Sequence, residues 1–274
     1  MQVIQWFDRR RKELLKKKPE HVALVLSGGA TRGAAHIGVL QVLEREGILP
    51  SIVAGNSAGS IVGAAYAAGV PADEMSEIFH KLDWGMLARP ARFGAGGIFT
   101  SRPMEKFIEQ KIGELTFDQL PRQLAVVACD IVSGERVVLN EGLVARAVRA
   151  SSAVPGLFKP VEIDGRLLVD GGVVENFPVS LAMDMGADYI IGVNVTITDH
   201  FGAPPNNFIQ TIIAANSIRG RVILPDRDLI NCLIEPDLRA YSSWDFEHSR
   251  EMEIAGRIAA ERALPQLMQD LGMN

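Results

Sequence analysis

The sequence predicts an α/β protein in which a mainly parallel central sheet is covered by helices in three α/β/α layers. Two observations carry this prediction. Short apolar runs with the length of buried strands alternate with longer runs in which apolar residues recur at helical spacing. The turns between these runs are short, which favours parallel strands joined by helices. With 274 residues, the chain can bury a sizeable core.

The first four elements alternate strand, helix, strand and helix, and we expect them at 21–26, 34–46, 51–54 and 58–69. Gly47 and Gly69 have the positions of residues that end helices. Further strands are expected at 124–130, 136–139, 167–170 and 189–195. Further helices are expected at 72–82 and, with a bend at Pro265, at 247–271.

Charge divides the chain into a short basic arm and an acidic body. The net charge is −5, which argues against nucleic acid as the main partner. Residues 1–18 carry seven basic and two acidic side chains, or +5, so the remainder carries −10. We therefore expect an N-terminal arm at 1–20 and one domain at 21–274, with its characteristic motifs within 22–195.

The arm has the composition of an interfacial helix, with apolar side chains on one side of a helical projection and most basic side chains on the other. Transient contact of residues 1–18 with an anionic membrane surface is one interpretation. A helix packed on the domain, or a frayed basic tail, is the other.

The remaining composition favours a cytoplasmic location, and membrane contact of the arm would make the protein peripheral on the inner face of a membrane. Cys129 and Cys232 lie in apolar strand-like runs without other metal-ligating residues nearby, as expected of buried thiols in a reducing compartment. The basic N-terminus lacks the apolar region of a secretory signal. The longest uncharged stretch, 47–72, is interrupted by Pro50 and by many Gly and Ser residues, so it is not a transmembrane helix.

Residues 55–59, Gly-Asn-Ser-Ala-Gly, have the Gly-x-Ser-x-Gly pattern of a nucleophile elbow, a strained turn from a strand into a helix. Small residues at Gly55 and Gly59 let neighbouring backbone pass close to the serine. The helix that begins at Ala58 directs its N–H groups and positive dipole end toward an oxyanion on a bound acyl group. The same pattern also occurs in simple Gly/Ser turns. The apolar strand before it and the small-residue helix after it favour Ser57 as a nucleophile.

A second glycine-rich loop, Ser27 to Gly33, lies between the first expected strand and helix. It is a poor dinucleotide-binding loop, because Ala30 replaces the middle glycine and no acidic residue occurs at 47–72 to bind a ribose. Backbone N–H groups of Gly28, Gly29 and Ala30 are better suited to an oxyanion hole. Because adjacent parallel strands end at the same edge of a sheet, this loop and the elbow are expected to form one site.

The serine needs a base, and the residues leave two arrangements open. The chain order Ser57, Asp170 and then His200 or His248 would suit a Ser-His-Asp triad, although an elbow after only two strands comes early for that fold. None of the five histidines lies in a glycine-rich context.

Asp170 does lie in such a context, because it ends an apolar strand and is followed by Gly171 and Gly172. Two glycines let another backbone or an acyl chain approach closely. An aspartate has a low pKa for a base, and burial beside the serine would raise it.

Three blocks together resemble the patatin-like phospholipase family: the glycine loop at 28–33 with its arginine, the elbow at 55–59, and Asp-Gly-Gly at 170–172. Weaker matches occur at 35–40, 151–156 and 173–178. The family uses a Ser–Asp dyad without a catalytic histidine, so the resemblance implies Ser57 as nucleophile and Asp170 as base. It implies that the glycine loop is the oxyanion hole, and it implies no metal or organic cofactor.

The glycine loop contains two residues with side chains that bear on the site, Ala30 and Arg32. Ala30 replaces the third glycine that is usual in the family, and alanine disfavours positive φ. Either the backbone there is in the right-handed or extended region, or the oxyanion hole is reshaped. Arg32 fits the family's basic position beside Gly33, and we expect it to brace the loop through backbone carbonyls rather than to bind a lipid phosphate.

The resemblance thus implies an enzyme that hydrolyses phospholipids, lysophospholipids or related lipid esters through an acyl-enzyme. The segment at 83–102, rich in glycine and apolar residues, is expected to be an irregular cap over the acyl-binding groove. A non-catalytic lipid-binding or regulatory protein of the same fold, a Ser-His-Asp esterase and an acyltransferase are the alternatives.

Overall fold

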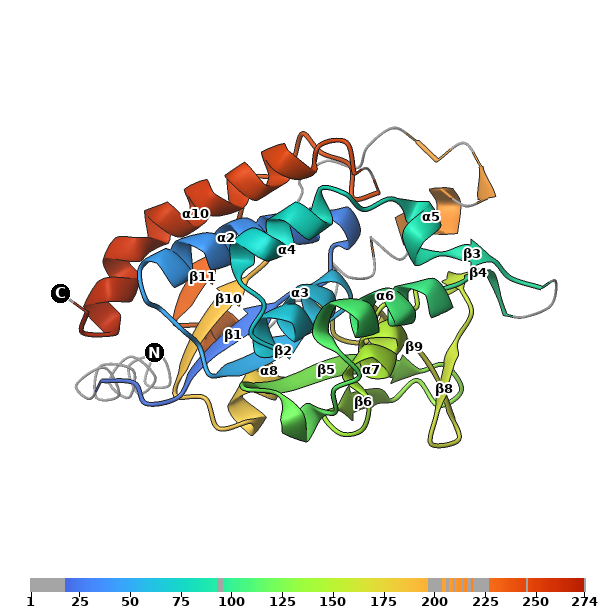
Figure 1. The fold of residues 1–274 in the computed structure, drawn as a ribbon, viewed down its shortest axis with the longest axis horizontal. Helices are drawn as coiled ribbons and strands as arrows, with labels where there is room; N and C mark the ends of the chain where they lie inside the picture. Colours follow the sequence, from blue (N-terminus) through green and yellow to red (C-terminus); the bar gives the residue numbers. More distant parts are fainter. Residues whose placement is uncertain are drawn as a thin grey trace, which may run out of the picture.

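The computed structural model describes residues 18–92, 96–196, 204–205, 207–208, 210–212, 214–215, 218, 227–244 and 246–273. An eight-stranded sheet lies between helices on both faces, which confirms the predicted fold class (Figure 1). In sheet order the strands are β11 (Cys232–Ile234), β10 (Tyr189–Val193), β1 (Val22–Leu26), β2 (Ile52–Gly55), β5 (Gln123–Asp130), β9 (Arg166–Asp170) and β8 (Val161–Ile163), with β6 (Arg136–Leu139) paired to β5.

The sheet is parallel from β11 to β5 and antiparallel where β6, β9 and β8 join it. Within the parallel part, Leu26 lies opposite both Gly55 of β2 and Val193 of β10. The strands β1, β2 and β10 therefore end level with one another, and the loops that follow them share one edge of the sheet. This confirms the prediction that the glycine loop and the elbow are neighbours.

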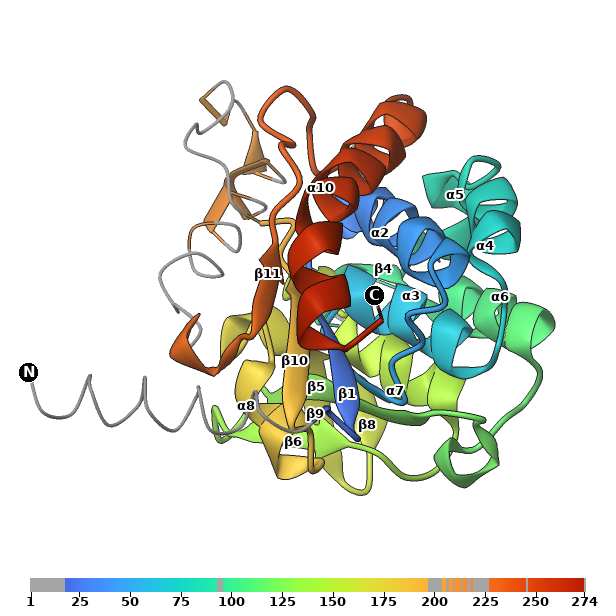
Figure 2. The ribbon, with the colours of Figure 1, turned by 90° about the vertical axis from the view of Figure 1, so that its left-hand side faces the viewer.

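The apolar runs of the central strands are continuous because both faces of the sheet are covered (Figure 2). In β1, Leu24 and Leu26 belong to the cluster on one face, whereas Ala23 and Val25 belong to the cluster on the other. The first face is covered by α2 (Gly33–Arg45), α3 (Ala58–Ala67), α4 (Ala72–Phe79), α6 (Arg102–Ile112), α7 (Val144–Ser151) and α10 (Ser249–Asp270), and the second by α8 (Val179–Asp184).

A second, three-stranded sheet lies beyond the edge of the first. It contains β3 (Arg89–Pro90), β4 (Gly97–Thr100) and β7 (Gly156–Phe158), and the short helix α5 (Trp84–Leu87) precedes it. The prediction that 83–102 is irregular is therefore wrong. The hairpin was not evident in the sequence because β4 completes its pairing with β7, which lies more than fifty residues later in the chain.

Two further expectations concern the cysteines and the membrane. Cys129 in β5 and Cys232 in β11 are buried thiols, as predicted. No helix in the described part of the chain is long and apolar enough to cross a membrane. Of the basic arm at 1–18, only Lys18 lies within the described residues, so the boundary at residue 20 and the membrane contact of the arm stay predictions.

The helices α2 and α10 pack at very short range through a pair of glycines. A Cβ atom on Gly38 would lie 2.0 Å from the carbonyl oxygen of Glu253, and one on Gly256 would lie 2.1 Å from that of Ala35. Since each obstacle is backbone, it cannot be moved by a rotamer change. The two glycines therefore fix the spacing of the helices that cover the glycine loop.

We expect Gly256→Ala to lower the free energy of unfolding by about 1–3 kcal/mol, although alanine is the better helix former, because the methyl group overpacks the interface. Urea unfolding followed by circular dichroism measures this. Gly85→Ala in α5 is the matched control, since its nearest atom is the end of the Asp83 side chain at 3.1 Å. Equal stability of both variants would contradict the close helix contact.

Candidate active site

Ser57 lies between β2 and α3 in a strained backbone conformation, with φ 49° and ψ −121°. Such a conformation costs a non-glycine residue about 1–3 kcal/mol and is held only by the surrounding structure. The Ser57 amide donates to the Ser151 hydroxyl at 3.1 Å, and the carbonyl oxygen of Ser57 accepts from the amide of Ser60 at 2.8 Å. The turn matches the strained geometry of a nucleophile elbow.

Glycines around the elbow occupy places where side chains would collide with backbone. A Cβ on Gly59 would lie 2.3 Å from the carbonyl oxygen of Leu26, and one on Gly55 would lie 2.7 Å from that of Gly59. These contacts bring α3, β1 and β2 together directly behind the serine. At Gly171 the close neighbours are the Asn56 side chain and the Val127 backbone, not an open groove for an acyl chain.

Asp170 reaches the elbow from β9, which runs antiparallel to β5 and places Asp170 opposite Ala128. Its side chain is 6% exposed. Oδ1 accepts from the Gly172 amide at 2.7 Å and from Asn56 Nδ2 at 3.2 Å. The Ser57 side chain is close enough to this carboxylate to lower its pKa, so the fold brings the two predicted catalytic side chains together.

The pKa of the Asp170 carboxyl lies above its ordinary value. Burial is the main cause, because it penalises the charged form. The hydrogen bonds from Ser57, Gly172 and Asn56 act in the opposite direction and partly offset it. A carboxylate in this setting is a stronger base than an exposed aspartate, which is the direction that the sequence analysis anticipated.

Asn56 and Asn176 hold the carboxylate in place, and neither was assigned a role from the sequence. Asn56 Nδ2 donates to Asn176 Oδ1 at 3.1 Å as well as to Asp170, and Asn56 Oδ1 accepts from the Ser151 hydroxyl at 3.4 Å. All four residues are buried. Both residues could have been found from the sequence by their polarity in apolar surroundings. Asn56 directly precedes the nucleophile, and Asn176 comes six positions after Asp170.

The glycine loop supplies fewer N–H donors than predicted. The Gly28 amide donates to the carbonyl oxygen of Asn176 at 3.0 Å, so it is occupied by a backbone contact. A Cβ on Gly28 would also lie 2.4 Å from Asn176 Oδ1. The prediction that Gly28 donates to an oxyanion is therefore corrected: Gly28 ties the loop to the Asn176 segment. Among the described residues, no hydrogen-bond partner is found for the amides of Gly29 and Ala30.

Ala30 has φ 50°, in the left-handed region that favours glycine. Of the two alternatives given for Ala30, the right-handed or extended backbone is therefore wrong. The backbone keeps the conformation suited to the family's glycine, and the alanine carries strain of about 1–2 kcal/mol. The Ala30 methyl group lies in the wall of the cavity next to Ser57.

A loop before α10 holds the other half of the glycine loop. The Thr31 amide donates to the carbonyl oxygen of Ser243 at 3.0 Å, and the Arg32 guanidinium donates to that of Tyr241 at 2.8 Å. The guanidinium thus binds a backbone carbonyl, as expected of a residue that braces the loop. Gly33 begins α2, and a Cβ there would lie 3.1 Å from that of Ala58.

The described histidines make contacts other than one with Ser57. His36 is fully buried, its Nε2 lies 2.9 Å from the Ser27 carbonyl oxygen, and burial lowers its pKa to about 4. His80 bonds Ser249 and Glu253 of α10. The ring of His248 packs near Tyr241. His200 lies outside the described residues. The described ranges contain no cluster of three or more His, Cys, Asp or Glu side chains able to hold a metal ion.

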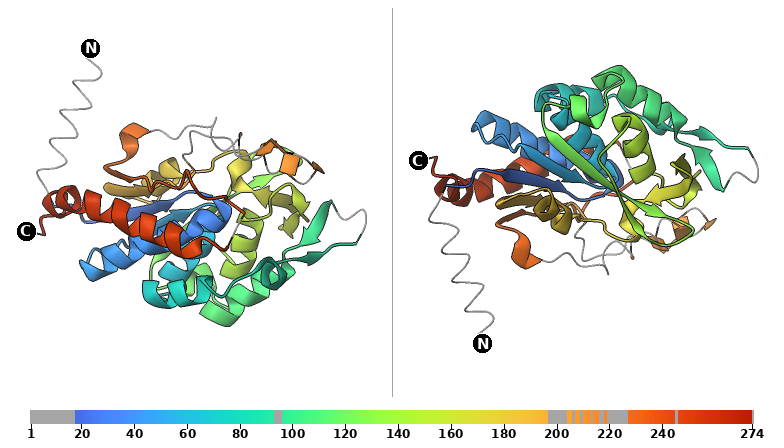
Figure 3. Two further views of the ribbon diagram at one scale, coloured as in Figure 1. Left: turned by 90° about the horizontal axis from the view of Figure 1, so that it is seen from above. Right: turned by 90° about the horizontal axis from the view of Figure 1, so that it is seen from below.

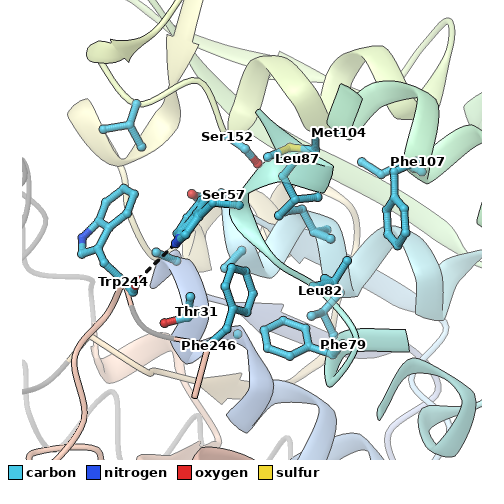
Figure 4. Close-up of a pocket in the computed structure, with 18 of the residues that line it drawn as sticks. Thr31, Ser57, Phe79, Leu82, Leu87, Met104, Phe107, Ser152, Trp244 and Phe246 are labelled. Carbon is cyan, nitrogen blue, oxygen red and sulfur yellow. Dashed lines mark hydrogen bonds between the residues drawn. The ribbon is translucent and has the colours of Figure 1, made fainter. Parts of the chain in front are cut away.

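Ser57 opens into an apolar cavity with about 690 Å³ of empty space, part of it open to solvent (Figure 4). Its walls come from α3, α4, α5, α6 and the loop before α10; they include Val62, Phe79, Trp84, Leu87, Phe107 and Phe246. Trp84 stacks on Trp244 with ring centroids 5.3 Å apart, and its Nε1 donates to the Trp244 carbonyl at 3.2 Å. The segment 83–102 thus contributes a wall of the cavity.

Ala30→Gly should raise the free energy of unfolding by up to about 1 kcal/mol, because glycine adopts positive φ without strain. Part of this stabilisation is offset, since glycine has more conformational entropy in the unfolded chain. Thermal unfolding measures the change. Ala34→Gly in α2 is the matched control, and it should lose stability because its backbone is helical. A loss of stability in both variants would contradict the strain at Ala30.

The fold has relatives among solved structures. VipD from Legionella pneumophila aligns with 90% of this chain and 67% of its own, at a TM-score of 0.60 and 17% identity. ExoU from Pseudomonas aeruginosa, in complex with SpcU, aligns with 93% of this chain and 53% of its own, at a TM-score of 0.53 and 15% identity. At these identities the likeness concerns the fold.

Sequence comparison gives nearer relatives. An uncharacterised NTE family protein of Mycobacterium tuberculosis is 36% identical over 176 residues, which cover 64% of this chain and 49% of that protein. Patatin-like phospholipase domain-containing protein 6 of Mus musculus is 32% identical over 185 residues, 65% of this chain and 14% of that protein. The chain spans about half the length of the mycobacterial relatives it matches. The model of the patatin-like phospholipase family matches residues 24–183, more than half of the chain, and the protein belongs to this family.

Proposed function

We propose that the protein is a serine acyl-hydrolase that cleaves carboxylic ester bonds of phospholipids, lysophospholipids or related lipid esters. One observation carries the proposal: a strained elbow serine, Ser57, lies beside the buried Asp170 carboxylate at the wall of an apolar cavity. Membership of a family named for phospholipase activity supports the lipid substrate class.

In the proposed reaction, Asp170 accepts the proton of the Ser57 hydroxyl as Oγ attacks the ester carbonyl carbon. The two hydrogen bonds to Oδ1 from Gly172 and Asn56 orient the carboxylate and leave Oδ2 available. The leaving alcohol takes the proton back, and the acyl group stays on Ser57. Asp170 then takes a proton from a water molecule, whose oxygen attacks the acyl carbon. The bond to Oγ breaks, the carboxylic acid leaves, and Asp170 returns the proton to Ser57 Oγ.

The negative charge on the carbonyl oxygen is proposed to be stabilised by the amides of Gly29 and Ala30 and by the N-terminus of α3. Each such donor typically contributes about 2.7–4 kcal/mol to the transition state. The backbone contacts of Thr31 and Arg32 with the 241–243 loop keep the glycine loop in place. Preorganised donors need no reorientation as the charge develops, which is the source of their effect.

The cavity supports an apolar acyl chain as the group bound next to Ser57. Beyond the shared wall of Ile61, Val62 and Phe107, a second apolar hollow between α4 and α6 has about 540 Å³ of empty space. The second hollow lies on the other side of these residues, further from the serine. Headgroup contacts would lie on the opposite side, toward solvent.

We expect Ser57→Ala to lower hydrolysis of a lysophospholipid at least about 10⁴-fold and to abolish labelling by a fluorophosphonate probe, since the nucleophile is removed. Asp170→Asn should lower the rate by a comparable factor because the amide cannot accept the proton. His248→Ala is the control and should retain wild-type activity.

Labelling that survives Ser57→Ala would refute the assignment of Ser57 as the nucleophile. Loss of activity in His248→Ala would favour a Ser-His-Asp triad. If the wild type is not labelled, a non-catalytic protein is favoured. If more acyl group is transferred to an added alcohol than is released as free fatty acid, an acyltransferase is favoured.

The raised pKa of Asp170 predicts the pH dependence of kcat/KM. The base must be unprotonated, so activity should fall as the pH drops through a pKa above the ordinary value for aspartate. Asn56→Ala removes a hydrogen bond that lowers this pKa, and the acidic limb should move to higher pH. Asn140→Ala, an exposed position outside the site, is the control. An unmoved limb in Asn56→Ala would argue that a different group titrates.

A further inference from the structure

We propose that the small sheet β3–β4–β7, at the same end of the molecule as Ser57, docks the protein on an anionic lipid surface. This inference goes beyond the hydrolytic reaction and identifies where the protein meets its substrate's membrane. The sheet and the segments next to it combine three features: positive charge without an ion-pair partner in the described ranges, exposed apolar side chains and a wall of the cavity.

The charge of this region is opposite to that of the whole chain. Residues 84–104 contain Arg89, Arg92 and Arg102 and no Asp or Glu, and Lys159 follows β7 in a stretch, 150–161, that also lacks acidic residues. All four basic side chains are exposed. None of them is in an ion pair with a carboxylate of the described ranges.

The strand pairing brings these charges together. Arg89 lies opposite Thr100 of β4, and the Lys159 amide donates to the carbonyl oxygen of Phe99 at 2.8 Å. Because neighbouring strands are about 4.8 Å apart, the backbones of Arg89 and Lys159 are roughly 10 Å apart across the sheet. Phe99 packs against a buried cluster and Phe158 lines the cavity, so the aromatic side chains point inward and the basic ones outward.

Arg102 supports a role for this charge outside the fold itself. It occupies the first position of the eleven-residue helix α6, where the positive end of the helix dipole disfavours a cation. A carboxylate or a small cap residue would stabilise the helix better. Arg102 therefore does not serve the stability of α6, and binding of an anionic partner at this surface would account for it.

Apolar side chains accompany the charge. Met86 of α5 is 41% exposed, although its neighbours Trp84 and Leu87 line the cavity. Phe208 is 72% exposed and comes four residues before Ile212, which contacts β7 at Gly156. A lipid that leaves the bilayer at this surface would therefore be next to the wall of the cavity that contains Ser57.

The position of the sheet on the molecule separates this surface from the basic arm. The β3–β4 hairpin projects from the end of the protein opposite the C-terminus (Figure 3). Lys18, the first described residue, lies near Gly272 at the C-terminal end and precedes β1 on the amino side of the sheet. Lys18 therefore lies at the opposite end of the domain from Ser57, whereas the hairpin lies at the same end as the site.

The test measures partitioning of the full chain, in a Ser57→Ala background, onto vesicles of phosphatidylglycerol and phosphatidylcholine. Arg89→Gln/Lys159→Gln should weaken partitioning roughly 25-fold, since each basic residue at an anionic surface contributes about fivefold. The difference should shrink at high salt and be absent on pure phosphatidylcholine. Arg227→Gln/Arg262→Gln removes the same charge elsewhere and should change partitioning less than about twofold.

A label reports which end touches the lipid. The native cysteines are buried, so a polarity-sensitive fluorophore attached at Met86→Cys should shift to the blue on anionic vesicles, whereas one at Arg262→Cys should not. Unchanged partitioning of Arg89→Gln/Lys159→Gln, an equal loss in the control pair, or no shift at Met86→Cys would each overturn the docking surface. Because partitioning and fluorescence are measured in the Ser57→Ala variant, they report binding and not hydrolysis. The results are therefore independent of whether the wild type hydrolyses lipid esters.

Discussion

The buried carboxylate of Asp170 is the group on which the arrangement of the site depends. An isolated charge in an apolar interior is strongly unfavourable, so it must be met by donors at fixed positions. Asn56 and Gly172 supply them, and the Ser57 side chain lies next to the same carboxylate. These donors come from β2 and from the turn after β9, so the ends of two strands far apart in sequence are held together around one charge.

Strain at the site is concentrated in two residues on neighbouring loops. Ser57 and Ala30 both adopt φ near +50°, which an L-residue keeps only where the surroundings impose it. The imposing contacts are short backbone approaches at glycines, such as that of Gly59 to Leu26. The small residues of the motifs are thus required by close packing of α3 on β1 and β2 as much as by the chemistry.

The glycine loop is held from both sides by parts of the chain that are distant in sequence. Gly28 binds the backbone of Asn176, while Thr31 and Arg32 bind the backbone of the 241–243 loop. The same loop provides Trp244 and Phe246 to the cavity. Ordering of the N–H donors and closure of the apolar cavity therefore depend on one segment, which the glycine pair of α2 and α10 anchors from behind.

The sequence alone determined the fold class and the shared edge of the two loops, because apolar periodicity and short motifs are local properties. The residues left the base open between Asp170 and a histidine, and only the resemblance to the patatin-like family favoured Asp170. It placed the ends of most central strands within two residues. What it left undetermined was long-range: that β9 enters antiparallel, that β4 pairs with β7, and that the Gly28 amide is already bound. Hydrogen bonds between strands and loops have no local pattern in the chain. Ala30 shows the limit most clearly, since its local preference pointed away from positive φ and the tertiary contacts around the loop overrode it.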